Sequence, residues 1–417
     1  MAKGPAYDVI VFGATSFVGQ ILCRYLADTF PGTLKWAAAG RSRAKLEALR
    51  AALGAADLPL IVADAGDDAG LAALCRQTRV VVTTVGPYAL YGEPLVRACA
   101  ESGTDYCDLT GEVQWIRRMI ERYEGAARRS GARIVHCCGF DSIPSDLGVY
   151  FLQQQARARY GHHCTQVSML VKAISGGASG GTVASLVNVV KEASKDPALR
   201  RELANPYSIC PPGHEFHVRQ AGLSGTHFDP HFQCWTAPFV MGAINTRVVH
   251  RSNALLHYAY GKDFRYAEAT MMGRGARGWA AAQAMSAGIA AFMLAVAVAP
   301  LRSVVEKYAL PKPGEGPSPA AQARGFYDFR FHGVTARGQA LRIKVTGDRD
   351  PGYGSTAKML GQAAACLVRD IAKADCPGGF WTPASVFGDK LLRRLVDHAG
   401  LAFVVLPDHP AASAQSA

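Results

Sequence analysis

Over the first 150 residues, short continuous apolar runs alternate with segments in which apolar residues recur at helical spacing. Short apolar runs typical of buried strands occur at 9–12, 34–39, 58–63, 80–85, 106–109 and 134–138. Segments with helical spacing lie between them, at 18–27, 44–53, 71–76, 93–102 and 114–130. Continuous apolar strands that alternate with helices are typical of a parallel sheet covered on both faces. The pattern therefore predicts an α/β protein whose residues 1–150 form a Rossmann-type doubly wound parallel sheet.

The regular alternation ends near residue 150, and we expect a second, mixed α+β domain over 151–417. Residues 166–173 are expected to form a strand and 181–193 a helix. Apolar and polar residues alternate around Phe329 and Ile343, which predicts two antiparallel strands with one buried face. A strong helical pattern covers 355–373, and we expect this helix to pack back on the first domain. The second domain is expected to bind substrate and to form a homodimer.

One segment, 278–301, carries no charge and has about the length needed to cross a bilayer. It is rich in alanine, so its transfer energy into lipid is weak. Small residues recur at every fourth position from Ala287 to Ala299, a spacing that favours close helix packing. Three interpretations stay open: a buried or dimer-interface helix, a membrane-surface or re-entrant segment, and a true span.

Composition narrows the classes of partner. The chain has 417 residues and a formal net charge of +12, which suits a polyanionic ligand or an anionic membrane surface. Its basic residues are scattered and no nucleic-acid-binding motif is present, so we expect no nucleic-acid partner. The 11 cysteines include no C-x-x-C pair, which favours reduced thiols in the cytoplasm. We expect no metal, because the histidines of the His214–His217 stretch lack the spacing of a zinc-protease helix.

The loop after the first predicted strand has the pattern of a dinucleotide grip. Gly13 and Gly19 hold the outer positions of the glycine fingerprint, and Ser16 stands where a middle glycine is expected. A tight turn without a ligand is the alternative, but the place of the loop in the first βα unit favours a nucleotide. We therefore predict that the cofactor contacts Gly13, Ala14, Thr15, Ser16, Phe17, Val18 and Gly19, with the Ser16 hydroxyl donating to a phosphate.

The loop after the second strand indicates which dinucleotide is bound. NAD-binding proteins usually carry an acidic residue about 20 positions after the glycines. This chain instead has Arg41, Ser42 and Lys45, and a 2′-phosphate would pair with the cations Arg41 and Lys45. The cofactor is therefore expected to be NADP, with Asp64 near the adenine edge.

Two further loops are expected to meet the nicotinamide and the substrate. Val85, Gly86 and Pro87 follow the fourth strand and should lie beneath the nicotinamide half. Tyr88 comes next and carries a hydroxyl suited to proton donation. Asp141 and Ser142 follow the sixth strand and are expected to position the acyl group or relay a proton. For each of these residues a turn or capping role is the alternative.

Several motifs together resemble the saccharopine dehydrogenase-like oxidoreductases, and within them the trans-acting enoyl reductase branch. The motifs are "VFGATSFVG", "AAGRSRAKL", "VGPYALYGEPLVRACAESGTDYCDLTGE", "GFDSIPSDLG", "SGGASGGTVAS", "DPGYGSTAKML" and "GGFWTPASVFGDKLLRRL", and they span nearly the whole chain. The family usually has glycine at the position of Ser16. The resemblance implies an NADP-binding Rossmann domain, a second domain for substrate, and a role in lipid or polyketide metabolism.

The leading functional hypothesis is an NADP(H)-dependent enoyl reductase that acts on acyl or polyketide thioesters in lipid or glycolipid biosynthesis. Hydride would reach the β-carbon, while Tyr88, Asp141 and Ser142 serve the proton and the acyl group. The substrate is expected on a carrier protein, and the enzyme in the cytoplasm, peripheral to the plasma membrane. A saccharopine-type reductase of imines or amino acids and a non-catalytic, lipid-associated NADP-binding protein are the alternatives.

Overall fold

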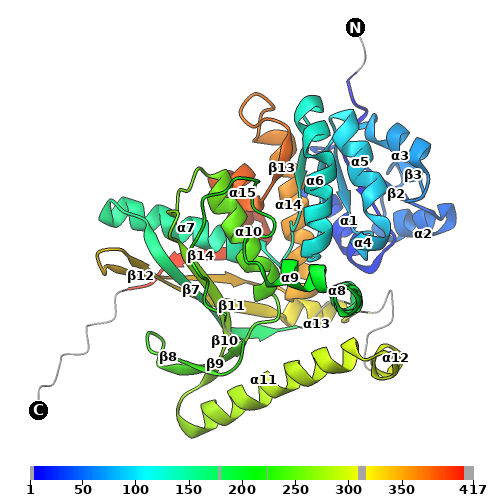
Figure 1. Cartoon of the computed structure of the whole chain (residues 1–417). Helices are drawn as coiled ribbons and strands as arrows, with labels where there is room; N and C mark the ends of the chain where they lie inside the picture. The colour runs from blue at the N-terminus through cyan, green and yellow to red at the C-terminus, as the bar shows by residue number, and fades with distance from the viewer. Residues whose placement is uncertain (1–3, 177–179, 223, 309–315, 408–417) are drawn as a thin grey trace, which may run out of the picture.

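The computed structural model describes residues 4–176, 180–222, 224–308 and 316–407 (Figure 1). Its first sheet has seven strands in the order β13-β6-β5-β4-β1-β2-β3, and every neighbouring pair is parallel. The strands are β1 (Tyr7–Phe12), β2 (Trp36–Gly40), β3 (Leu60–Val62), β4 (Thr78–Thr83), β5 (Asp105–Cys107), β6 (Arg133–Val135) and β13 (Gly379–Trp381). This order confirms the predicted doubly wound sheet.

Helices cover this first sheet because each presents an apolar stripe to it. In α1, Leu22 and Leu26 lie one turn apart and are both buried. The helix α6 ends at Gly131, whose φ of 81° is one that glycine adopts without strain. The helices of this part are α1 (Phe17–Thr29), α2 (Arg43–Leu53), α3 (Asp68–Cys75), α4 (Tyr88–Tyr91), α5 (Glu93–Ser102) and α6 (Val113–Ser130).

The second sheet also has seven strands, in the order β14-β12-β11-β7-β10-β9-β8. Only β7 and β10 pair in parallel, so the sheet is mixed, as predicted. In β11, Tyr327, Phe329 and Phe331 alternate with polar residues and are fully buried, as the period-2 pattern predicted. The strands are β7 (Cys164–Ser175), β8 (His227–Asp229), β9 (Cys234–Pro238), β10 (Arg265–Gly273), β11 (Phe326–Thr335), β12 (Ala340–Gly347) and β14 (Leu401–Val405).

The second half also contains helices that the apolar pattern did not place. The sequence predicted no helix at α7 (Ile143–Tyr160), which begins directly after Ser142. The predicted single segment 278–301 is in fact two helices, α11 (Gly275–Ala297) and α12 (Ala299–Tyr308), because Pro300 cannot continue a helix from Val296. The other helices are α8 (Gly180–Lys195), α9 (Pro197–Ala204), α10 (Gly242–Leu255), α13 (Pro319–Arg324), α14 (Thr356–Arg369) and α15 (Pro383–Ala399), with a π-helical turn at Pro351–Ser355.

The C-terminal part of the chain returns to the first sheet. In Figure 1, α14 runs beside α1, and Gln362 of α14 donates a hydrogen bond to the Tyr25 hydroxyl of α1 at 2.7 Å. The strand β13 then extends the sheet beside β6. The predicted helix 355–373 ends earlier, at Arg369, because the chain turns so that the amide of Ile371 donates to Cys366.

A buried ion cluster secures this C-terminal return. Asp105, the first residue of β5, accepts hydrogen bonds from the guanidinium group and the backbone amide of Arg133 and from the ammonium group of Lys373. Arg133 in turn donates to the Ile371 carbonyl at 2.8 Å. Side chains of Asp105 and Arg133 are each 2% exposed. The cluster therefore ties β5 and β6 to the segment that follows α14.

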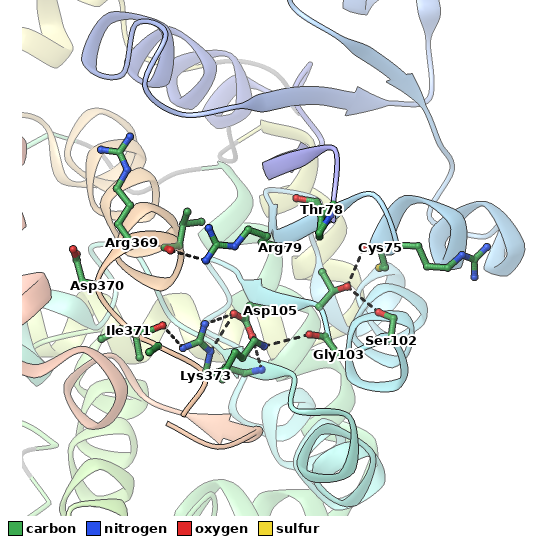
Figure 2. Close-up of a pocket in the computed structure, with 16 residues that line it drawn as sticks. Cys75, Thr78, Arg79, Ser102, Gly103, Asp105, Arg369, Asp370, Ile371 and Lys373 are labelled. Atoms are coloured by element: carbon green, nitrogen blue, oxygen red, sulfur yellow. Dashed lines mark hydrogen bonds and ion pairs between the residues drawn. The ribbon is translucent and has the colours of Figure 1, made fainter. Parts of the chain in front are cut away.

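The same cluster lies against a recess of about 610 Å³ (Figure 2). Its lining includes Thr78, Asp105 and Arg133, which begin β4, β5 and β6. Ligands of open α/β sheets bind at the opposite edge, where the strands end. The recess is therefore not the expected cofactor site, although it is a pronounced hollow.

Candidate functional site

The strand order reverses between β1 and β4, which creates the topological switch point of the first sheet. These two strands are parallel neighbours, while β2 lies beyond β1 and β5 beyond β4. The loop 13–19 follows β1 and the loop 84–87 follows β4, so both emerge at this point. Dinucleotides bind at such switch points. The structure thus brings together the predicted glycine loop and the predicted loop beneath the nicotinamide.

The glycine loop is so tight that side chains are excluded at both of its outer positions. Gly13 has a φ of 85°, and a Cβ atom there would lie 2.7 Å from the Val85 side chain. A Cβ atom on Gly19 would lie 2.2 Å from the Gly13 carbonyl oxygen. The loop therefore needs glycine for close approach between β1, α1 and the loop after β4.

The Ser16 hydroxyl makes hydrogen bonds within the protein. It accepts from the amide of Gly19 at 2.9 Å and so caps α1. It also lies 2.8 Å from the Thr84 hydroxyl, which donates to the Gly13 carbonyl. The Ser16 proton is therefore directed at Thr84, inside the protein. The first amides of α1, those of Phe17 and Val18, have no carbonyl partner within the helix and are the donors that a helix N-terminus offers to a phosphate.

The loop after β2 presents the predicted basic residues to solvent at the same edge of the sheet. The Arg41 side chain is 79% exposed, and its Nε atom lies 4.0 Å from a carboxylate oxygen of Asp64. Ser42 caps α2 by accepting from the amide of Lys45 at 3.3 Å. The guanidinium group of Arg41 and the positive end of the α2 dipole thus lie together, and both favour binding of a 2′-phosphate.

Tyr88 lies where the sequence predicted it, but its hydroxyl is engaged within the protein. The Gly86–Pro87 peptide bond is cis, and Tyr88 follows it as the first residue of α4. Its hydroxyl donates to the Thr83 carbonyl at 3.1 Å and accepts from the amide of Leu109 at 3.1 Å. Burial raises the pKa of this phenol well above its usual value. The geometry therefore favours a role in holding the ends of β4 and β5 together.

Glu112 is a site residue that the sequence analysis missed. Its carboxylate accepts from the amides of Tyr88 at 2.8 Å and Ala89 at 2.9 Å. It also accepts from the hydroxyl of Ser185 at 2.7 Å, which joins the loop after β4 to α8. Burial raises the pKa of Glu112. An acidic residue immediately after a buried strand, in the "DLTGE" motif, was the signal that could have identified it.

Asp141 has the electrostatics of a proton donor. It follows β6, is half-buried, and lies close enough to Tyr88 to influence its ionisation. Burial raises the pKa of Asp141 to about 7. Within the described ranges, no hydrogen bond or ion pair engages its carboxyl group. A carboxyl group in this state is part acid and part carboxylate at neutral pH, which is what general acid–base chemistry requires.

The neighbouring Ser142 belongs to a buried polar chain. Its hydroxyl donates to the side-chain oxygen of Asn245 at 3.0 Å, and the Asn245 amide donates to Glu268 at 2.9 Å. Burial raises the pKa of Glu268 to about 6. Ser142 is completely buried, and its hydroxyl links the start of α7 to this polar chain. Asn245 and Glu268 come from α10 and β10, which no local pattern connects to this loop.

Known proteins are similar in sequence to the first domain and to nearly the whole chain. Residues 9–135 match the family model of the saccharopine dehydrogenase NADP-binding domain. A trans-acting enoyl reductase of Mycobacterium ulcerans is 38% identical over 413 residues, covering 93% of this chain and 95% of that protein. A Mycobacterium tuberculosis protein, provisionally named a trans-acting enoyl reductase, is 41% identical over 404 residues with the same coverage.

Among solved structures, the fold is similar to that of a saccharopine dehydrogenase from Saccharomyces cerevisiae. The TM-score is 0.54, with 12% sequence identity, over 96% of this chain and all of that one. At this identity the similarity concerns the fold alone. It places both sheets of the present chain within one known two-part architecture.

Proposed function

This chain belongs to the trans-acting enoyl reductase family of saccharopine dehydrogenase-like, NADP-dependent oxidoreductases, and from that membership we propose that it reduces the double bond of an enoyl thioester held on a separate carrier protein. Relatives that cover nearly the whole chain are named trans-acting enoyl reductases, which supports the reaction. The observation that carries the proposal within the chain is the Asp141 carboxyl group, unpaired and with a pKa of about 7, beside the switch-point loops.

The residues of the chain fit the cofactor. Gly13 and Gly19 let β1, α1 and the loop after β4 approach closely, and the positive end of the α1 dipole lies at this loop, where a pyrophosphate would bind. Arg41 supplies a cation for the 2′-phosphate. When bound, NADPH supplies a hydride to the β-carbon of the enoyl group. Asp141 in its acid form donates a proton to the α-carbon, and the saturated thioester results.

The decisive experiment measures NADPH oxidation by the full chain with a crotonyl thioester on a carrier protein. We expect saturation of the crotonyl group, and slower turnover when the thioester is carried by coenzyme A. Reduction of an amino-acid imine in preference to the crotonyl thioester would favour the saccharopine-type alternative and overturn the proposal.

Arg41→Ala is expected to weaken NADPH binding and leave NADH binding unchanged. The loss should be about 1.5–3 kcal/mol, the usual contribution of a hydrogen bond to a charged group. Arg43→Ala is the matched control, because Arg43 is already paired with Glu47 at 2.8 Å on α2. Nicotinamide fluorescence titration measures both affinities. Equal losses for the two variants would show that Arg41 has no specific contact with the 2′-phosphate.

Tyr88→Phe separates the two roles considered for this side chain. We expect a loss of stability of about 1–3 kcal/mol, because the buried amide of Leu109 loses its partner. The kcat should stay near that of the wild type, since the hydroxyl is engaged internally. Thermal unfolding and NADPH turnover are measured on the same preparation. A hundredfold lower kcat with unchanged stability would identify Tyr88 as the proton donor instead.

A further inference from the structure

The helix α11 leaves most of an apolar surface exposed. Among the described residues it is the one helix long and apolar enough to cross a membrane, yet only 11% of its most apolar window is buried. Figure 1 shows it as a long rod along the outside of the second sheet, followed by α12. We call its exposed apolar side chains, with those of α12, the α11–α12 face: Trp279, Met285, Met293, Leu294, Val298, Leu301 and Val304.

The inner side of α11 is docked too firmly for the helix to act as a separate span. The helix packs against β9 and β10 of the second sheet. Ala282 and Val296 are completely buried, and Ser286 bonds to Thr226 at 3.2 Å. A span would have to break these contacts and turn both sides of the helix to lipid. The geometry instead allows α11 to lie flat, with only its outer side in contact with lipid.

The charged residues near α11 indicate which kind of surface the α11–α12 face binds. Arg274 and Arg277 are exposed at the start of α11, next to Trp279, which is 46% exposed. Tryptophan favours the boundary between headgroups and acyl chains, and arginine favours anionic headgroups. No charged residue interrupts the sequence from Gly278 to Leu301, and the whole chain carries +12. We propose that the α11–α12 face binds the surface of an anionic lipid bilayer, with α11 parallel to the membrane plane.

The helix α8 connects the α11–α12 face to the candidate active site. α8 packs against α11 and, through Ser185, bonds to Glu112 at the active-site loop. Two packed helices, α11 and α8, therefore connect the proposed bilayer surface to the active-site loops. The proposal does not depend on which double bond is reduced, because membrane binding is measured without turnover.

The test is sedimentation of the full chain with vesicles of phosphatidylglycerol and phosphatidylcholine, against phosphatidylcholine alone. We expect binding to the anionic vesicles that weakens as salt rises. Arg274→Gln with Arg277→Gln should lower the affinity by about thirtyfold, since each basic residue near an anionic surface contributes about fivefold. Leu294→Glu should also weaken binding, because Leu294 is 64% exposed on the proposed face. Val396→Glu on α15, at an apolar position 45% exposed, is the matched control and should bind like the wild type.

Four outcomes would overturn the proposal, the last of them through the orientation of α11. The first is absence of wild-type sedimentation at low salt. The second is equal loss in Leu294→Glu and Val396→Glu, which would show that the effect is not local to this face. The third is a stable dimer that Leu294→Glu dissociates and that ignores vesicles, which would assign the face to a second copy of the chain. Resistance of the bound protein to extraction by alkaline carbonate would contradict the flat orientation and indicate a span.

Discussion

Asp105→Asn is expected to lower the free energy of unfolding by about 3–5 kcal/mol, the usual cost of removing one partner from a buried ion pair. Arg133 is 2% exposed and would remain charged without its counter-ion. Lys373 would lose its carboxylate as well. Because the cluster joins β5 and β6 to the segment after α14, the loss should be cooperative and should appear in urea unfolding followed by circular dichroism.

An exposed ion pair of the same domain supplies the control. Asp68 is 64% exposed and pairs with Arg97, so Asp68→Asn should change stability by no more than about 1 kcal/mol. Replacing Asp105 by asparagine leaves the shape of the side chain nearly unchanged, so the difference between the two variants isolates charge and burial. Similar small effects in both would mean that Arg133 finds other partners or water.

Asp141→Asn is expected to lower kcat by about 10²–10⁴-fold, the usual contribution of a positioned general acid. The variant keeps the size of the side chain but has no proton to give, while the loops that hold the cofactor are untouched. NADPH affinity, measured by fluorescence titration, should therefore equal that of the wild type. Turnover of a crotonyl thioester on a carrier protein measures the loss.

The pH dependence gives the same hypothesis a second measurement. Burial raises the pKa of Asp141 to about 7, so the carboxyl group is protonated below that pH and ionised above it. A general acid acts in its protonated form, so kcat of the wild type should fall as pH rises through about 7. This limb should be missing from the Asp141→Asn profile. A wild-type kcat that rises over the same range would assign the titration to a base and exclude Asp141 as the donor.

The strongest periodic signals predicted the fold well. Most strands of the first sheet contain continuous apolar runs, and β11 and β12 alternate apolar and polar residues. In both cases most of the residues that the pattern marks as buried are buried in the fold. The strand β13 was missed because it is three residues long and follows a glycine pair. Its pairing with β6 depends on residues far away in the chain. The helix α7 was missed because residues 143–148 carry polar groups that are buried only after α10 and α15 pack against them.

The sequence predicted where the candidate site residues lie, but it did not predict which residues they contact. The glycine loop, Arg41, Tyr88 and Asp141 all lie at the ends of the strands that the pattern assigned. Their roles depend on partners that no local spacing reveals. Ser16 caps its own helix because Thr84 is beside it, and Tyr88 is satisfied by Thr83 and Leu109. Glu112 and Asn245 are held by contacts across the fold, which only the three-dimensional arrangement makes visible.

The return of the C-terminal segment to the first sheet sets an order of events during synthesis. Arg133 and the carbonyl of Ile371 are 238 residues apart in the chain. At ordinary rates of translation, a ribosome needs on the order of 10–50 seconds to make that stretch. During this interval the edge of β6 is uncovered and the nascent glycine loop belongs to an unfinished domain. The edge of β6 therefore stays without its β13 partner until the C-terminal segment has been made.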